Sequence, residues 1–152
     1  MGMKRIISFL SLLLLLSEGT ALAKPDYSEF SQAFTNFFTS LDAILKALPS
    51  VTNASGTVEI IDAWSLANET FCAAGERFVA KHPEVFNQRE PPPEFVELFG
   101  RMERLKTHYD AVPAGVGKLM RRFGAVPEVQ EAVKRFKKSI DRVDNLGRPP
   151  KK

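Results

Sequence analysis

Few side chains in the 152-residue sequence are of the types that bind transition metals: one cysteine, Cys72, and two histidines, His82 and His108. A zinc site in a helical protein needs several such ligands at helical spacing, and a di-iron bundle needs Glu-x-x-His on two helices. Valine stands three residues before His82 and leucine three residues before His108, so neither belongs to that motif. We therefore predict no metal ligands and structural roles for both histidines.

Haem is a second chemistry that small exported helical bundles support. Covalent attachment needs Cys-x-x-Cys-His, which a chain with one cysteine cannot form. Non-covalent binding needs a methionine or histidine pair that faces the core from different helices. The candidates are His82, His108, Met102 and Met120, and three of these fall on one expected helix. We predict no cofactor and no cofactor-binding residues.

Nucleophilic catalysis would depend on Cys72. No basic residue stands three or four positions before or after it, so nothing local favours the thiolate. We expect a small buried apolar residue instead. The run GVGK at residues 115–118 has neither the preceding strand nor the full spacing of a phosphate loop. No catalytic residues are predicted, and the chain is not expected to be an enzyme.

Basic residues gather towards the C-terminus. Residues 118–152 hold 11 basic and 4 acidic residues, net +7, whereas residues 24–117 hold 8 basic and 13 acidic residues, net −5. One interpretation is a solvated face that balances the acidic first half, and the other is a patch for an anionic surface. We call this candidate set the basic patch: Lys118, Arg121, Arg122, Lys134, Arg135, Lys137, Lys138 and Arg142. Aromatic residues do not alternate with these cations, so no specific nucleic-acid partner is expected.

Two Asn-x-Ser/Thr patterns, at Asn53 and Asn68, match the glycosylation acceptor motif. The leader resembles a bacterial one, so we interpret Asn53 as a turn residue and Asn68 as a residue on a polar helix face.

Residues 1–23 have the organisation of a signal peptide. Lys4 and Arg5 precede the apolar run IISFLSLLLLL at residues 6–16, and the small-residue motif ALA at residues 21–23 follows. The run is shorter than the roughly 20 residues that span a bilayer. We expect cleavage before Lys24 and a periplasmic or secreted mature protein.

The rest of the chain has the apolar spacing of α-helices, alternating between three and four residues. The first helix, over residues 27–48, follows a capping-box pattern of Asp26 and Glu29. Its apolar seam is Tyr27, Phe30, Phe34, Phe37, Leu41, Ile44 and Leu48. The second, starting between residues 53 and 57 and ending at residue 82, has the seam Ile60, Trp64, Ala67, Phe71, Ala74 and Phe78. The fourth, starting at Pro127 and ending before Gly147, has the seam Val129, Val133, Phe136, Ile140 and Val143.

The third helix is expected to run from about Glu94 to Phe123. Its apolar spacing continues through Pro113, which predicts one long helix that is kinked there and softened by Gly115 and Gly117. Four such helices joined by short connections predict an all-α fold, an antiparallel four-helix bundle with coiled-coil-type spacing, over residues 24–147. The alternative is a long helical hairpin with two docked helices. Residues 148–152 are expected to be a short, flexible basic tail.

Two segments are similar to small exported helical proteins that recur, uncharacterised, in bacterial genomes. One is the turn SVTNAS at residues 50–55, and the other is PPPE at residues 91–94, before a long helix and a short proline-started one. The resemblance implies a helical fold, export and no known activity.

These observations favour an exported, non-catalytic helical module that binds a partner, either an anionic surface or another exported protein. The alternative function is a bundle that holds a small ligand or cofactor in its core.

Overall fold

The computed structural model describes residues 26–83 and 93–146, apart from the side chains of residues 94, 95, 98, 99 and 102. The described part is helical and contains no strand, which confirms the all-α prediction. Its elements are α2 (Ser28–Ala47), the 3₁₀ turn η1 (Leu48–Ser50), α3 (Ala54–Lys81), α4 (Pro93–Tyr109), α5 (Ala111–Phe123) and α6 (Pro127–Asn145). The expected signal peptide and the basic tail at residues 148–152 lie outside the described residues.

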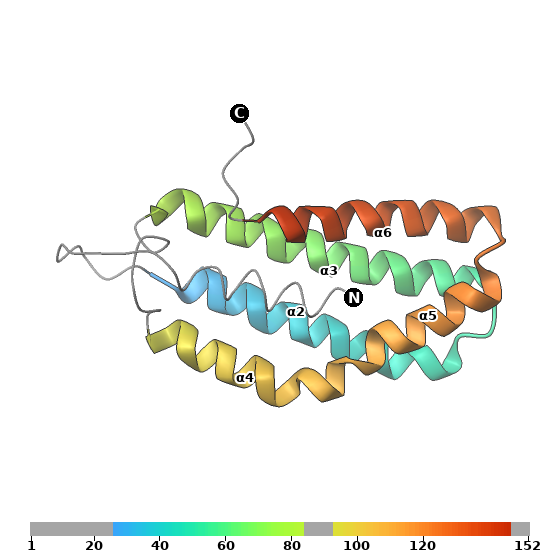
Figure 1. The fold of residues 1–152 in the computed structure, drawn as a ribbon, viewed down its shortest axis with the longest axis horizontal. Coiled ribbons are helices and arrows are strands. Elements are labelled where there is room, and N and C mark those ends of the chain that lie inside the picture. Colours follow the sequence, from blue (N-terminus) through green and yellow to red (C-terminus); the bar gives the residue numbers. More distant parts are fainter. Residues whose placement is uncertain (1–25, 84–92, 147–152) are drawn as a thin grey trace.

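Helix α3 is the central element. Figure 1 shows it between α6 and α2, with α4 on the far side of α2, and its most extensive contacts are with α6 and α2. Helices α3 and α6 run parallel, because Asp62, Asn68 and Glu76 contact Arg135, Ser139 and Arg142 in the same order. A closed up-down bundle places its second and fourth helices diagonally. The predicted antiparallel four-helix bundle is therefore not confirmed.

The expected third helix is divided in two. Helix α4 ends at Tyr109 and α5 begins at Ala111, with Asp110 between them. Pro113 has no N–H to donate to the carbonyl of Tyr109, four residues earlier, so the regular bond pattern cannot pass this point. The change of direction is thus three residues before the proline, and the structure has two successive helices where one kinked helix was predicted.

Helix α2 starts differently from the prediction. The carboxylate of Asp26 accepts a hydrogen bond from the Ser28 amide at 2.9 Å, but Glu29 does not complete a capping box. Its carboxylate instead accepts from Arg77 at 2.6 Å and from Lys81 at 3.2 Å. These bonds fix the first turn of α2 to the last turns of α3, and they lower the pKa of Glu29.

The core is aromatic where α2 meets α3. The two predicted apolar seams are buried there almost throughout, with Phe34, Leu41 and Phe71 each at most 2% exposed. Phe71 packs against the rings of Phe30 and Phe37, at centroid distances of 5.6 and 5.4 Å. Aromatic pairs at such distances stabilise a core beyond the area they bury, so the phenylalanines of α2 join it firmly to α3.

The contact between α3 and α6 is built on smaller side chains. Its buried residues on α6 include Val129, Ala132, Ser139 and Val143, whereas the predicted Val133, Phe136 and Ile140 are only partly buried. The buried face is therefore rotated from the expected seam. Asn68, expected on a polar face, is fully buried, and its amide donates to the hydroxyl of Ser139 at 3.1 Å.

This buried polar pair gives a stability prediction. Replacing Ser139 with alanine removes the acceptor for the Asn68 amide, whose carbonyl oxygen already has no partner within the described residues. A buried polar group left unpaired costs about 1–3 kcal/mol, so Ser139→Ala should lower the free energy of unfolding by that amount in urea titration.

The matched control is Ser65→Ala. The Ser65 hydroxyl is also buried, but it donates only to the Ile61 carbonyl in its own helix, at 2.9 Å. Its loss should change the free energy of unfolding by less than about 1 kcal/mol. Equal losses in the two variants would show that the α3–α6 bond contributes nothing specific.

Candidate functional site

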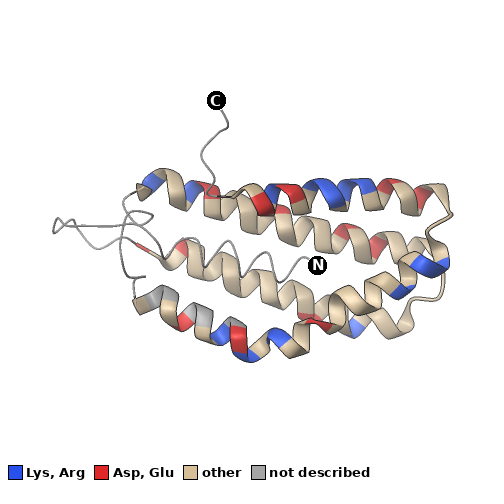
Figure 2. Cartoon of the chain, in the orientation of Figure 1, with Lys and Arg blue, Asp and Glu red and all other residues tan. Residues whose placement is uncertain are grey.

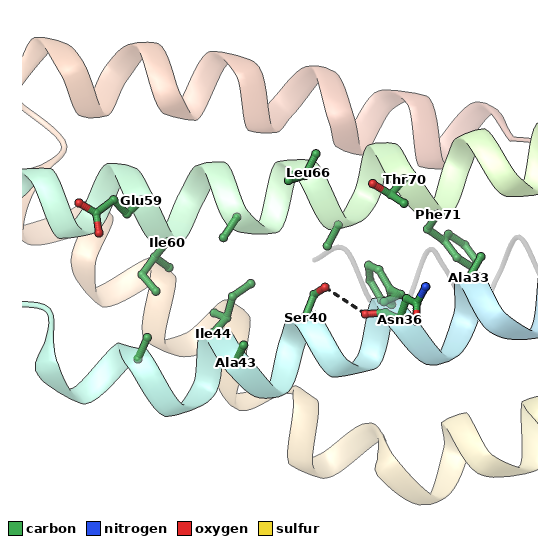
Figure 3. A pocket seen from close by; sticks show the side chains of 14 residues that line it. Ala33, Asn36, Ser40, Ala43, Ile44, Glu59, Ile60, Leu66, Thr70 and Phe71 are labelled. Atoms are coloured by element: carbon green, nitrogen blue, oxygen red, sulfur yellow. Dashed lines mark hydrogen bonds between the residues drawn. The ribbon is translucent and has the colours of Figure 1, made fainter.

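A groove of about 490 Å³ lies between α2 and α3. Seven residues of α2 between positions 33 and 47 and seven residues of α3 between positions 59 and 71 line it (Figure 3). Clefts of about 300–1,000 Å³ with mainly apolar walls are the usual sites for small ligands. The groove is therefore the candidate functional site of the described part of the chain.

Alanines produce the space in this groove. Five of its fourteen lining residues are alanine: Ala33, Ala43, Ala47, Ala63 and Ala67. The bulky residues of the lining, such as Phe37, Ile44 and Phe71, are buried in the core. The helices are thus joined through their inner faces, while the small alanine side chains, of which Ala43 and Ala63 are exposed, leave the groove unfilled.

The groove is almost free of charge. Glu59 is its one ionisable lining residue, although 26% of the chain is Asp, Glu, Lys or Arg. The wall hydroxyl of Ser40 donates to the Asn36 carbonyl at 3.0 Å (Figure 3), so its hydrogen-bonding need is met within α2. Leu66, at the rim, is 65% exposed. Such a surface loses little hydration when an apolar group covers it.

A second, polar hollow of about 280 Å³ lies at one end of the groove and shares Ala47, Glu59 and Ile60 with it. Most of its lining comes from the turn between α2 and α3, residues 50–53, and the start of α3. Asn53 caps α3, because its side chain accepts from the Gly56 amide at 2.8 Å. The prediction of Asn53 as a turn residue is confirmed, and the turn places polar atoms at the groove's end.

The structure divides the basic patch between two helices. Lys118, Arg121 and Arg122 lie on α5, and the other five residues lie on α6. Figure 2 shows the α5 cations near the α5–α6 turn and the main α6 cluster further along its helix. Glu128 and Glu131, in the first turns of α6, stand between the two groups in the sequence.

Ion pairs occupy three residues of the patch. Arg135 binds Asp62 through two hydrogen bonds of 3.0 and 2.8 Å, and Arg142 binds Glu76 through two of 2.9 and 2.6 Å. Lys134 binds Glu131 within α6 at 2.6 Å. These arginines attach α6 to α3, and the bond from Arg142 lowers the pKa of Glu76.

The remaining cations of the patch are Lys118, Arg121, Arg122, Lys137 and Lys138. They are exposed and form no ion pair with the described part of the chain. Arg122 lies 4.9 Å from the ring centroid of Phe123.

The histidines lie in different surroundings. His82 is the C-cap of α3 and contacts the Phe78 ring at a centroid distance of 5.1 Å. His108 is exposed on α4, and its Nε2 lies 3.2 Å from the Asp42 carboxylate of α2. Met120 is partly buried against the core, and the side chain of Met102 lies outside the described residues. His82, His108 and Met120 thus lie at the end of α3, on α4 and on α5, respectively.

Among the side chains that the structure describes within residues 26–83 and 93–146, no group of three or more from His, Cys, Asp or Glu could hold a metal ion. No helix in the same ranges is long and apolar enough to cross a membrane.

Comparison with known proteins returned no matching family model, no matching curated protein and no matching solved structure.

Sequence patterns could have pointed to the groove. Residues 30–41 contain no charged side chain, which is unusual for a helix with one face in water. Leu66 lies outside the α3 seam, so an exposed leucine could have been expected there. These two signals indicate an apolar outer surface but not a groove. The spacing of apolar residues identifies the core, and a few alanines do not reveal that a space between two helices is unfilled.

Cys72 is fully buried, and burial raises its pKa from 9.0 to about 12. At neutral pH this shift alone lowers the thiolate fraction about a thousandfold. Thiol reagents should therefore label the native protein at least a thousandfold more slowly than the denatured protein. Rapid native labelling, or a disulfide-linked dimer on a non-reducing gel, would contradict this.

The same shift sets a pH dependence. A raised thiol pKa in the folded state stabilises the fold below the unfolded value of about 9, and this contribution is lost as the pH rises towards 12. In Cys72→Ala this alkaline loss should be smaller, as measured by urea titration across the same pH range.

Proposed function

We propose that this chain is an exported, non-catalytic helical binding protein, and that its binding site for apolar ligands is the groove between α2 and α3. The observation that carries the proposal is the nearly uncharged lining of a groove of about 490 Å³. Burial of apolar surface drives association, and most of this lining can be covered without stripping water from a charge.

The signal-peptide pattern of residues 1–23 supports export, with a periplasmic or secreted location for the mature chain. The scarcity of histidine and cysteine in the sequence supports a non-catalytic role. The sequence-based alternative placed a ligand inside the bundle. The available space instead supports a ligand on the outer side of the α2–α3 pair, where Ala43 and Ala63 are exposed.

The test is binding of N-phenyl-1-naphthylamine, a dye that fluoresces strongly in apolar sites. Ala63→Phe places a large ring in the groove and should weaken dye binding at least about tenfold, equivalent to 1.4 kcal/mol.

The matched control, Ala114→Phe, makes the same change at an exposed helical alanine of α5 outside the groove, and should bind as the unaltered protein does. Absence of dye binding to the unaltered protein, or equal weakening in both variants, would refute the proposal.

A second candidate function is attachment to an anionic surface through the basic patch. The supporting observation is that five of its eight cations are exposed and form no ion pair with the described residues. Arg135 and Arg142 are less suited to this role, because Asp62 and Glu76 already neutralise them.

Sedimentation with anionic vesicles tests this candidate. Combined Lys137→Gln and Lys138→Gln should weaken binding about tenfold or more, since each lysine near an anionic membrane contributes about 1 kcal/mol. Combined Lys46→Gln and Lys106→Gln, an equal charge change outside the patch, should have less effect. Binding should weaken steeply with salt. If the protein does not sediment with the vesicles at low salt, the basic patch is only a solvated face and this candidate function is wrong.

A further inference from the structure

We propose that the groove binds a single unbranched acyl chain, with a cationic or hydroxyl-bearing head group in the polar hollow at the α2–α3 turn. The inference rests on the proposed function and specifies its ligand. It combines two observations: an apolar groove between the helices and a polar hollow that opens from one end of it. The apolar groove and the polar hollow together match the shape and polarity of an amphiphile with one tail.

The length of the groove fits one acyl chain. Its lining runs from Ala33 to Ala47 on α2 and from Glu59 to Phe71 on α3. At 1.5 Å per helical residue, these spans are about 20 Å long. Half of a bilayer's hydrocarbon core, filled by one acyl chain, is about 15 Å thick. An extended membrane-type chain can therefore lie along the groove.

The volume distinguishes an acyl chain from a helix of a partner or of a second copy. A helix is at least about 10 Å wide, so a segment 20 Å long occupies about 1,600 Å³. This is more than three times the 490 Å³ available. A helix could therefore insert only part of one face, whereas a single acyl chain can lie within the groove along its length.

An extended peptide is narrow enough, but it needs hydrogen-bond partners for its backbone. The groove walls offer few, because most lining residues are apolar and the Ser40 hydroxyl already donates to Asn36. A hydrocarbon tail makes no such demand. The exposed Leu66 at the rim would also gain burial against a chain lying in the groove.

The polar hollow specifies the head group. Its side-chain functional groups are hydroxyls and an amide together with one carboxylate, that of Glu59, and neither lysine nor arginine lines it. The Glu59 carboxylate is exposed and lies 3.5 Å from the Ser55 hydroxyl. This arrangement favours an ammonium group or hydroxyl groups and disfavours a carboxylate or phosphate.

The experiment is displacement of N-phenyl-1-naphthylamine by amphiphiles below their micellar concentrations. Hexadecylamine should displace the dye at least about a hundredfold more effectively than octylamine, even if each added methylene is only half buried. Hexadecylamine and monopalmitoylglycerol should both displace it at lower concentration than hexadecanoate.

Glu59→Gln should reduce the preference for hexadecylamine over hexadecanoate by about two- to fivefold, the range expected for an exposed ion pair. The matched control is Glu69→Gln, an equal charge change at an exposed α3 position outside the groove, which should keep the preference.

The outcomes separate this inference from the proposed function. If the dye binds in the groove but no single-chain amphiphile displaces it, the inference is wrong and the proposed function stands. Equal displacement by octylamine and hexadecylamine, a preference for hexadecanoate, or an unchanged preference in Glu59→Gln would also overturn it. A monomer–dimer equilibrium that Ala63→Phe abolishes in analytical ultracentrifugation would identify a second copy as the occupant instead.

Discussion

The rest of the structure depends on the contact of α6 with α3. The buried hydrogen bond between Asn68 and Ser139 lies between two exposed arginine–carboxylate pairs. Burying an unpaired amide is costly. If α6 slid or rotated, the buried Asn68 amide would lose its hydrogen bond to the Ser139 hydroxyl. This bond therefore favours a single register of the two helices, while the small side chains around it allow close packing. Gly75 of α3, for instance, lies directly against Leu146.

This pairing explains why a groove remains on α2. Helix α6 uses one side of α3, and α5 contacts both α2 and α3. Phenylalanines hold α2 against α3 from the inside. None of these contacts requires large side chains on the outer α2–α3 face, where alanines and self-satisfied hydroxyls suffice. The groove thus remains because the core is packed through the inner faces of the helices. Its apolar character follows from the uncharged stretch of α2 at residues 30–41.

The spacing of apolar residues predicted the helical class well. The seams of the first two helices are buried as expected, and Asn53 caps α3 where a turn residue was predicted. The kink was predicted at Pro113, but the helices separate three residues earlier, at Asp110. A proline disrupts the hydrogen bonding of the turn that precedes it, so the break falls before the proline itself.

Features that depend on packing between distant segments could not be predicted in this way. Asn68 is polar, so a single sequence assigns it to the surface, and only its partner 71 residues away justifies its burial. Similarly, Arg135 and Arg142 join a basic run in the sequence, yet each faces a carboxylate on α3. Composition counts these charges but does not reveal which of them are already neutralised.

The parallel pairing of α3 with α6 also has a consequence for the order of events during synthesis. Helix α6 leaves the ribosome after the other described helices, and it carries the partners of Asp62, Asn68 and Glu76. Contacts between residues so far apart form slowly, because a long loop must close first. A nascent chain that stops before Pro127 can pair α2 with α3, but it leaves an uncovered face on α3. The described helices therefore reach their native arrangement only after α6 has been synthesised, and the face of α3 that α6 covers stays exposed until then.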